Sequence, residues 1–261
     1  MTDPKAAQEP ADSGGYLPGD PRYGLSGEAL KAYYRRKPAQ WVIQCLDRPD
    51  TAALRARLYP EHRAYMAKYA ADLIGHGPML ADDAAAGEIG HAFFVELPDR
   101  AAAEAFIASE PFNRAGIYDS VRVVRWSNSF LKRMQDYTPK PGWQQFLLIA
   151  SKRRGIEAML REHLHAHESY FGRFEENFVF RGPIRSEDGT ENFGSAIVIE
   201  LPDRAAMDDF WNNEPYSSHG VYQDDLTIYR WQFGNTVSVP IAHRPAAGAI
   251  RPTRSRRLPH A

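Results

Sequence analysis

The chain has 261 residues, enough for one or two domains, and its hydrophobic fraction of 43% is typical of a protein with a packed core. The 32 basic and 33 acidic residues nearly cancel, so the chain as a whole lacks the field that draws proteins to nucleic acid. No apolar run approaches the roughly 20 residues that span a bilayer. With a single cysteine, Cys45, and a polar N-terminus that lacks a signal-peptide pattern, we expect a cytoplasmic protein without an internal disulfide, a nucleic-acid partner or a membrane partner.

Residues 1–40 are interpreted as an N-terminal extension. The first 27 residues are rich in glycine, proline, aspartate and alanine and show no periodicity, so we expect an extended or disordered segment. A short helix is predicted from Gly27 to Arg36, because Pro38 disfavours helical backbone in the residue before it.

The first folded half is predicted over residues 41–128. Apolar runs and helical spacing predict, in chain order, a strand at 41–46, a helix at 52–71, a strand at 73–78 that ends in a Gly-Pro turn, a strand at 91–97, a helix from 99 to about 107, and a strand at 121–126.

Residues 129–142 carry charges and prolines and are predicted to be a linker, after which the pattern restarts over residues 143–235. Strands are predicted there at 143–150, 178–183, 195–201 and 226–231, with helices at 155–175 and 203–211. Residues 236–261 are predicted to be a basic disordered tail, since 240–261 contain four prolines, five arginines and no acidic residue. Such a tail is either a solubilising end or a contact for an acidic partner.

One stretch of the chain occurs twice. Residues 91–118 and 195–222 are identical at 13 of 28 positions, with a constant offset of 104. Each half therefore has the order strand-helix-strand-strand-helix-strand, which is the ferredoxin-like split unit. Helices would cover one face of each four-stranded antiparallel sheet and leave the other face without cover.

We therefore predict an α+β fold in which two ferredoxin-like repeats pack sheet to sheet as an intrachain pseudo-dimeric α+β barrel. Four tryptophans are expected at the edge of this interface: Trp126 and Trp231, which end the last strand of each half, and Trp41 and Trp143, which open the first. Whether the chain assembles further into a homo-oligomer is left open.

Several features that recur in both halves carry a family resemblance. They are His62, Gly77-Pro78 and the run Glu110-Pro111-Phe112 to Gly116-Ile117-Tyr118, and in the second half His167, Gly182-Pro183 and the run Glu214-Pro215-Tyr216 to Gly220-Val221-Tyr222. In these features each half resembles a YciI-like (YCII-related) domain of the dimeric α+β barrel superfamily. The resemblance implies a cleft that contains the helix histidine, often paired with an aspartate near the end of that helix. Some relatives act on small cyclic compounds.

The candidate catalytic residues follow from this resemblance. His62 and His167 would be general acids or bases, since imidazole titrates near neutral pH and a carboxylate fixes its tautomer. Asp72 is the carboxylate available near the end of the first helix, and Glu176, or its neighbour Glu175, near the end of the second. The structural alternative is a helix histidine that bonds to the backbone or to an ion-pair partner.

The candidate ligand-binding residues lie on the acidic-proline-aromatic runs. They are Glu110, Phe112 and Tyr118 in the first half and Glu214, Tyr216 and Tyr222 in the second. The aromatic residues would suit a flat apolar ligand or belong to the core, and the two glutamates would line a pocket or stabilise a turn.

A metal site is considered at His163 and His167, which share one helix face at i, i+4 spacing. The first half has Leu58 and Met66 at the equivalent spacing from His62, so solvated or core histidines are the favoured interpretation and no metal is predicted. The sequence lacks the nucleotide-binding motifs Gly-x-Gly-x-x-Gly and the P-loop, and it lacks the serine-hydrolase motif Gly-x-Ser-x-Gly. We therefore expect no cofactor.

Two functional hypotheses remain. In the first, the protein is a cofactor-independent acid/base enzyme of isomerase, lyase or hydrolase type that acts on a small cyclic or aromatic metabolite through a helix histidine. In the second, it is a non-catalytic small-ligand-binding or scaffold protein. A carboxylate within hydrogen-bond distance of a histidine ring nitrogen, in a cleft that is open to solvent, would favour the first hypothesis.

Overall fold

The computed structural model describes residues 23–35, 38–82, 87–129 and 132–234. The predictions for residues 1–22 of the extension and for the tail at 236–261 fall outside these residues. The predicted short helix is present as α1, Gly27–Arg35.

The first half contains the predicted order of strands and helices. Its elements are β1 (Gln40–Asp47), α2 (Ala52–Lys68), β2 (Leu73–Leu80), β3 (Glu88–Glu96), α3 (Arg100–Ser109), the short helix α4 (Pro111–Arg114) and β4 (Tyr118–Trp126). Asp99 caps α3, because its side chain accepts a hydrogen bond from the Ala102 backbone N–H.

The second half repeats this order. Its elements are β5 (Gln144–Ser151), α5 (Glu157–Gly172), the 3₁₀ turn η3 (Glu175–Asn177), β6 (Phe178–Arg185), β7 (Asn192–Leu201), α6 (Arg204–Asn212), the short helix α7 (Pro215–Ser218) and β8 (Thr227–Trp231). Asp203 caps α6 in the same way as Asp99 caps α3. None of the helices in the described part of the chain is long and apolar enough to cross a bilayer.

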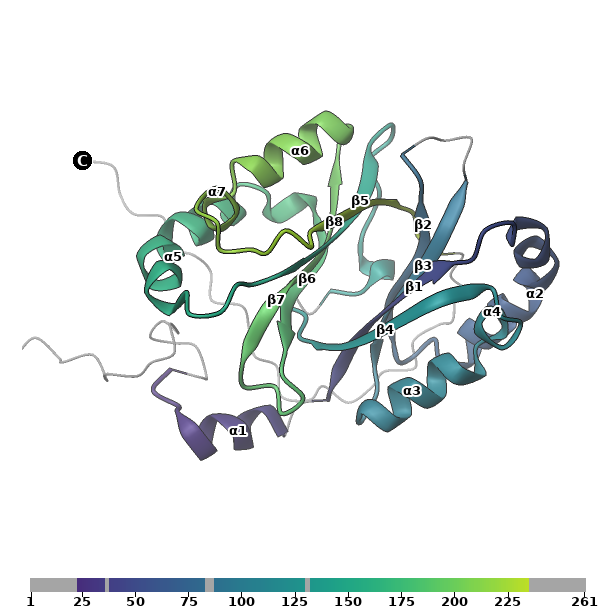
Figure 1. Cartoon of the computed structure of the whole chain (residues 1–261), viewed down its shortest axis with the longest axis horizontal. Coiled ribbons are helices and arrows are strands. Elements are labelled where there is room, and N and C mark those ends of the chain that lie inside the picture. The colour runs from purple at the N-terminus through teal and green to yellow at the C-terminus, as the bar shows by residue number, and fades with distance from the viewer. Residues whose placement is uncertain (1–22, 36–37, 83–86, 130–131, 235–261) are drawn as a thin grey trace, which may run out of the picture.

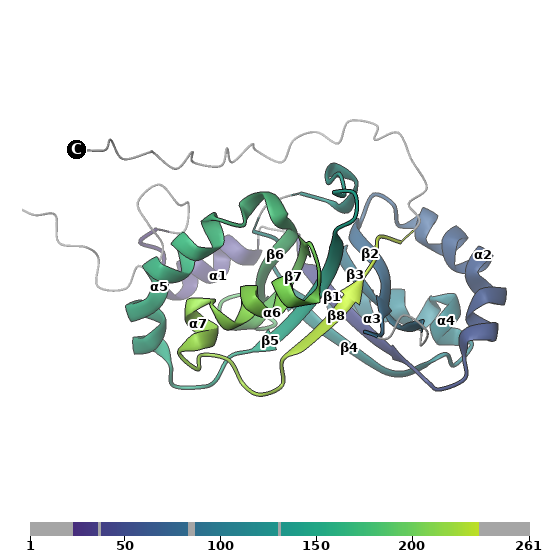
Figure 2. The same ribbon diagram turned by 90° about the horizontal axis from the view of Figure 1, so that it is seen from above.

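The eight strands form one closed barrel in the order β1-β3-β2-β8-β5-β7-β6-β4. Each half contributes a four-stranded antiparallel sheet, and the sheets join where β2 pairs with β8 and where β4 pairs with β6. Helices α2, α3 and α4 cover one side of the barrel and α5, α6 and α7 cover the opposite side (Figures 1 and 2). The predicted pseudo-dimeric α+β barrel is confirmed.

Side chains from both sheets fill the barrel interior. The interior cluster includes Val42 and Phe94 from the first half and Leu147 and Phe180 from the second. Residues that alternate with these along the strands, such as Trp41 and Phe93, point outward and form a separate core beneath the helices of the first half. The functional side chains described below lie in these helix-side layers.

The segment predicted as a linker is packed against the barrel. It contains the 3₁₀ turn η2 (Met134–Asp136), in which Met134 is buried. The Arg133 guanidinium donates to the Leu73 carbonyl at 2.7 Å, and the Tyr137 hydroxyl donates to Glu200 at 3.2 Å. The connection between the halves therefore contacts both of them.

The Gly-Pro turns predicted after the second strand of each half are wrong. Gly77-Pro78 lies inside β2, and the equivalent glycine, Gly182, lies inside β6. A Cβ atom at Gly77 would be 1.8 Å from the Gln232 carbonyl oxygen, and one at Gly182 would be 1.7 Å from the Ser127 carbonyl oxygen. The glycines are required because the chain that leaves the last strand of one half passes directly over the second strand of the other half.

Two buried tryptophans also contact the backbone where one half crosses the other at Gly77 and Gly182. The indole N–H of Trp231 donates to the Gly77 carbonyl at 3.2 Å, and that of Trp126 donates to the Gly182 carbonyl at 3.0 Å. Both side chains are about 1% exposed. The expected position between the sheets is confirmed for Trp126 and Trp231. It is wrong for Trp41, which lies in the core beneath the helices of the first half, and for Trp143, which is exposed.

Replacing Gly77 by alanine should lower the free energy of unfolding by about 3 kcal/mol, because the added methyl group must displace a backbone carbonyl in a closed barrel. Equilibrium unfolding in guanidinium, followed by tryptophan fluorescence, measures this change. Gly172 is the matched control, since a Cβ atom there meets nothing within 4 Å. Gly172→Ala should leave stability unchanged or raise it by up to about 1 kcal/mol. Equal effects of the two substitutions would contradict the role given to Gly77.

Candidate functional site

His62 lies in the middle of α2 and faces the sheet of the first half. Its Nδ1 atom is 2.7 Å from Oε1 of Glu110, and the two residues are 1% and 0% exposed. A carboxylate oxygen accepts, so Nδ1 carries the proton of this hydrogen bond. The pair is therefore a buried histidine-carboxylate dyad.

The second half contains the same dyad in a more open setting. Nδ1 of His167, on α5, is 2.6 Å from Oε1 of Glu214. The Glu214 side chain is fully buried, but 16% of the His167 side chain is exposed. Solvent and small molecules can therefore approach His167 but not His62.

The two glutamates are held by the local backbone. Glu110 is the N-cap of α4 and accepts from the Asn113 N–H at 2.9 Å, and Glu214 is the N-cap of α7 and accepts from the Ser217 N–H at 2.8 Å. The following prolines occupy the first helical turn, where a missing N–H costs nothing. Glu110 thus caps its helix with Oε2 and holds His62 with Oε1. In Glu214, Oε1 holds His167 and also accepts from the Tyr216 N–H, while Oε2 accepts from the Ser217 N–H.

The predicted carboxylate partners, Asp72 and Glu176, are wrong. His62 lies inside α2, which ends at Lys68, and Asp72 lies beyond that end, whereas Nδ1 of His62 is bonded to Glu110. Glu176 is an exposed residue of η3. The glutamates predicted as ligand-binding or turn residues are instead the partners of the histidines.

The predicted aromatic residues surround the two dyads. The Phe112 ring stacks on His62 with centroids 4.4 Å apart, and the Tyr216 ring stacks on His167 at 4.1 Å. Tyr118 and Tyr222 are 5% and 6% exposed, and the Tyr222 hydroxyl lies 3.3 Å from the Ser195 hydroxyl. The structure places Phe112 and Tyr216 against the two histidines, and all four aromatic residues are largely buried.

The halves differ at the strand positions beside each dyad. In the first half His76 on β2 and His91 on β3 approach His62, with ring centroids 5.8 Å and 4.8 Å away. The equivalent residues of the second half are Arg181 and Ser195. The sequence repeat gives no signal for His76 and His91, because the equivalent positions of the second half hold no histidine.

A second difference lies at the end of the first strand of each half. Asp47 at the end of β1 accepts from Arg55 Nε at 2.9 Å. Lys152 follows β5 at the position equivalent to Asp47, and its Nζ atom lies 5.5 Å from the Tyr216 ring centroid. The second half therefore places a cation where the first half has an ion pair.

Burial changes the protonation of these groups. Desolvation, together with the positive charge of a protonated His62, lowers the pKa of His76 to about 3, and the same causes lower the pKa of His91. Desolvation, with Arg185 nearby, lowers the pKa of Lys152 to about 8. Desolvation also lowers the pKa of Arg181 to about 10. At neutral pH the strand histidines are thus neutral, whereas Lys152 and Arg181 carry positive charge.

The histidine pair considered for metal does not form a site with a third ligand among the described residues. The His163 ring stacks on the exposed His219 at 3.8 Å, and His167 is bonded to Glu214. In the described part of the chain the grouping with metal-ligand spacing is His62, His76 and His91. This grouping was not expected from the sequence.

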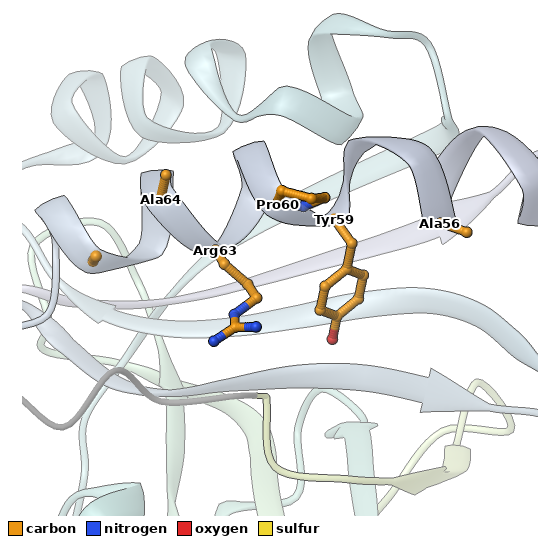
Figure 3. A pocket seen from close by; sticks show the side chains of 6 residues that line it. Ala56, Tyr59, Pro60, Arg63 and Ala64 are labelled. Carbon is orange, nitrogen blue, oxygen red and sulfur yellow. The ribbon is translucent and has the colours of Figure 1, made fainter.

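The outer face of α2 has a hollow of about 450 Å³, lined by Ala56, Tyr59, Pro60, Arg63, Ala64 and Ala67. Tyr59 and Arg63 extend from the same side of the helix (Figure 3). The Tyr59 ring also lies 5.7 Å from His62 and 6.0 Å from Phe112. Tyr59 therefore separates this hollow from the first dyad.

The fold and the dyads define an α+β barrel with one histidine-carboxylate pair in each half. Residues 39–127 match the YCII-related domain family. The first half of the chain is thus a YCII-related domain, as its resemblance implied, and the second half repeats its architecture.

Two of the solved structures that resemble this chain have a TM-score above 0.5 and share its fold. A candidate chlorite dismutase shares 13% identity over 75% of this chain and 96% of its own, with a TM-score of 0.52. A chlorite dismutase mutant from Candidatus Nitrospira defluvii shares 7% identity over 76% and 92%, with a TM-score of 0.51. A 5-chloro-2-hydroxyhydroquinone dehydrochlorinase from Burkholderia phenoliruptrix AC1100, in complex with 2,5-dihydroxybenzoquinone, shares 26% identity over 36% and 98%, with a TM-score of 0.32. No curated protein matches the sequence.

Removing the carboxylate of Glu214 should destabilise the protein, because His167 and the first turn of α7 both lose their acceptor. We expect Glu214→Ala to lower the free energy of unfolding by about 2–3 kcal/mol. Glu214→Gln, which keeps an acceptor oxygen, should cost less. Urea unfolding measures both values. The exposed Glu176 is the control, and Glu176→Gln should change stability by less than about 0.5 kcal/mol; a larger effect there would contradict the assignment of the partner.

Proposed function

We propose that the protein is an acid/base enzyme that acts on a small cyclic or aromatic metabolite with an acidic group, and that His167 is the reacting residue. The observation that carries the proposal is the partly exposed imidazole of His167 on the fully buried carboxylate of Glu214. A buried carboxylate that holds Nδ1 fixes the tautomer and leaves Nε2 to exchange a proton with a bound molecule.

The reaction type follows from what this dyad can do alone. The Nε2 atom of His167 would accept a proton from the substrate, and Glu214 would stabilise the imidazolium that forms. The same imidazolium would return the proton to another atom of the substrate or to a leaving group. Isomerisation, elimination and hydrolysis all fit this sequence of transfers, and none of these transfers needs a cofactor.

An acidic group on the substrate is supported by the cations around His167. Arg181 lies 4.8 Å from the ring of Phe171, which is 4.3 Å from the His167 ring. Lys152 lies against Tyr216, which stacks on the other side of the dyad. Lys152 and Arg181 are half-buried and positively charged at neutral pH, so a carboxylate or phenolate beside His167 would be attracted to both.

A non-catalytic role fits the first half better than the second. His62 is 1% exposed and its dyad is enclosed by aromatic rings, so a substrate cannot reach it without movement of Tyr59 or Phe112. The first dyad is therefore assigned no part in the proposed reaction. A small-ligand-binding protein without chemistry is the competing function for the whole chain.

Proton exchange distinguishes an enzyme from a binding protein. The probe is 3-oxocyclohexane-1-carboxylate, a small cyclic acid whose protons next to the ketone exchange slowly in D₂O. We expect the full chain to accelerate this exchange, followed by NMR, and His167→Gln to reduce the acceleration about 100-fold or more. His165→Gln, an exposed histidine of the same helix, should leave it unchanged. Binding of the probe without exchange would instead support the competing function.

Binding of an anion should weaken as pH rises through about 8, since Lys152 loses its charge there. Burial and Arg185 lower the pKa of Lys152, and Glu214 opposes them. The dissociation constant of benzoate, measured by calorimetry, should rise by up to about tenfold per pH unit above that value. Lys152→Met should remove this pH dependence, and Lys152→Arg should move it to higher pH. A wild-type constant that stays level from pH 7 to pH 9.5 would exclude Lys152 as the anion contact.

A further inference from the structure

Three histidines converge beneath α2 in the first half. One ring nitrogen from each of His62, His76 and His91 lies within 4.8 Å of those from the other two. The three residues are 1%, 3% and 1% exposed. Histidines are among the less commonly buried residues, so three in one buried cluster need a physical reason.

The register of two strands explains why the rings meet. In the β2–β3 pairing His76 lies opposite Phe93, and His91 precedes Phe93 by two residues. Side chains alternate along a strand, so these three residues share one face of the sheet. That face packs against α2, where His62 occupies a central position.

Several buried polar atoms in this cluster lack an acceptor or donor. Within the described part of the chain, Nε2 of His62 and Nδ1 of His91 have no hydrogen-bond partner, and neither has the nearby Tyr118 hydroxyl. Leaving such atoms buried without partners costs about 1–3 kcal/mol each. A group that binds Nε2 of His62 would remove the part of this cost that belongs to that atom.

The charges around the cluster favour a cation. Nδ1 of His76 and Nε2 of His91 lie within hydrogen-bond distance of each other, so one of the two nitrogens carries a proton that a metal ion would displace. Glu110 bonds to His62, and Asp47 and Glu88 flank the single guanidinium of Arg55. Three carboxylates against one guanidinium leave an excess of negative charge close to the three histidines.

We propose that His62, His76 and His91 bind one divalent first-row transition-metal ion, with Zn²⁺ as the reference ion. Imidazole nitrogen is a ligand that zinc, copper, iron and nickel all accept. Nδ1 of His76 and Nε2 of His91 are 3.2 Å apart, close to the roughly 3.3 Å that separates two nitrogens bound at 2.0–2.1 Å to a tetrahedral ion.

The His62–Glu110 hydrogen bond is the usual support for a metal-bound histidine. A ligating histidine commonly donates its other ring N–H to a carboxylate, which fixes the ring and raises the basicity of the ligand nitrogen. Here Nδ1 of His62 faces Glu110, and Nε2 is buried without a hydrogen-bond partner among the described residues. Three protein ligands leave one tetrahedral position free, as in catalytic rather than structural zinc sites.

The second half is an internal comparison for this proposal. It keeps the dyad of His167 and Glu214 but has Arg181 and Ser195 at the positions of His76 and His91. The Arg181 guanidinium has no lone pair to offer a metal ion and repels a cation. The metal site is therefore expected in the first half alone, and it is independent of the reaction proposed at His167.

Metal binding by the full chain, prepared without a histidine tag and freed of metal by chelation, tests the proposal. Titration with Zn²⁺ against a chromophoric competitor should show one tight site per chain, and Co²⁺ should give visible absorption bands typical of nitrogen ligands. His76→Gln should weaken the tight site about 100-fold or more, and Glu110→Gln about 10- to 100-fold. Addition of Zn²⁺ should raise the melting temperature of the wild type but not that of His76→Gln.

The matched control is His167→Gln, which removes the equivalent helix histidine of the second half and should keep the tight site. If His76→Gln does not fold, His91→Ser decides the test, because serine occupies the equivalent position of the second half. Wild-type affinity no higher than that of His76→Gln or His91→Ser would overturn the proposal. An equal loss in His167→Gln would also overturn it.

Discussion

The closed barrel depends on two places where one backbone contacts another without a side chain between them. At Gly77 and Gly182 the chain that leaves the last strand of one half passes over the second strand of the other, and Trp231 and Trp126 donate to the carbonyls of these glycines. Among the described residues, each seam consists of two paired residues and the backbone hydrogen bonds that continue beyond the end of the last strand. The interior apolar core therefore forms only when both seams close, and the helix-side layers depend on that core.

Because both halves of the barrel belong to one chain, the helix-side layers of the two halves can contain different residues. A homodimer would carry the same residues in both layers, whereas here each half has its own. Both retain a glutamate that caps a short helix and holds a histidine, so the local backbone and the dyad are coupled. Around this shared element the first half has neutral imidazoles and the second has cations. The duplicated fold thus holds two different chemical environments.

Burial separates the roles that these environments can have. His62 is enclosed, so a group that it binds must be small enough to lie among side chains, and a single ion meets this condition. His167 is partly open and is flanked by Lys152 and Arg181, so a small organic anion can approach it. In both halves desolvation is the main cause of the lowered pKa values. In the first half it keeps His76 and His91 neutral, which suits a bound cation. In the second half it leaves Lys152 charged at neutral pH, which suits a bound anion.

The sequence by itself determined the fold and the position of both dyad histidines. The repeat at an offset of 104 and the order of strands and helices predict two sheets, each with helices on one face only. The uncovered faces are buried when the two sheets pack against each other. The sequence did not determine the partners of the histidines. Asp72 lies near His62 in sequence, but Glu110 lies near it in space, because the turn between α3 and α4 folds back over α2. Nor could spacing reveal that His76 and His91 share a sheet face with each other and lie beneath His62. Strand register and helix packing are long-range contacts, and only the tertiary structure decided them.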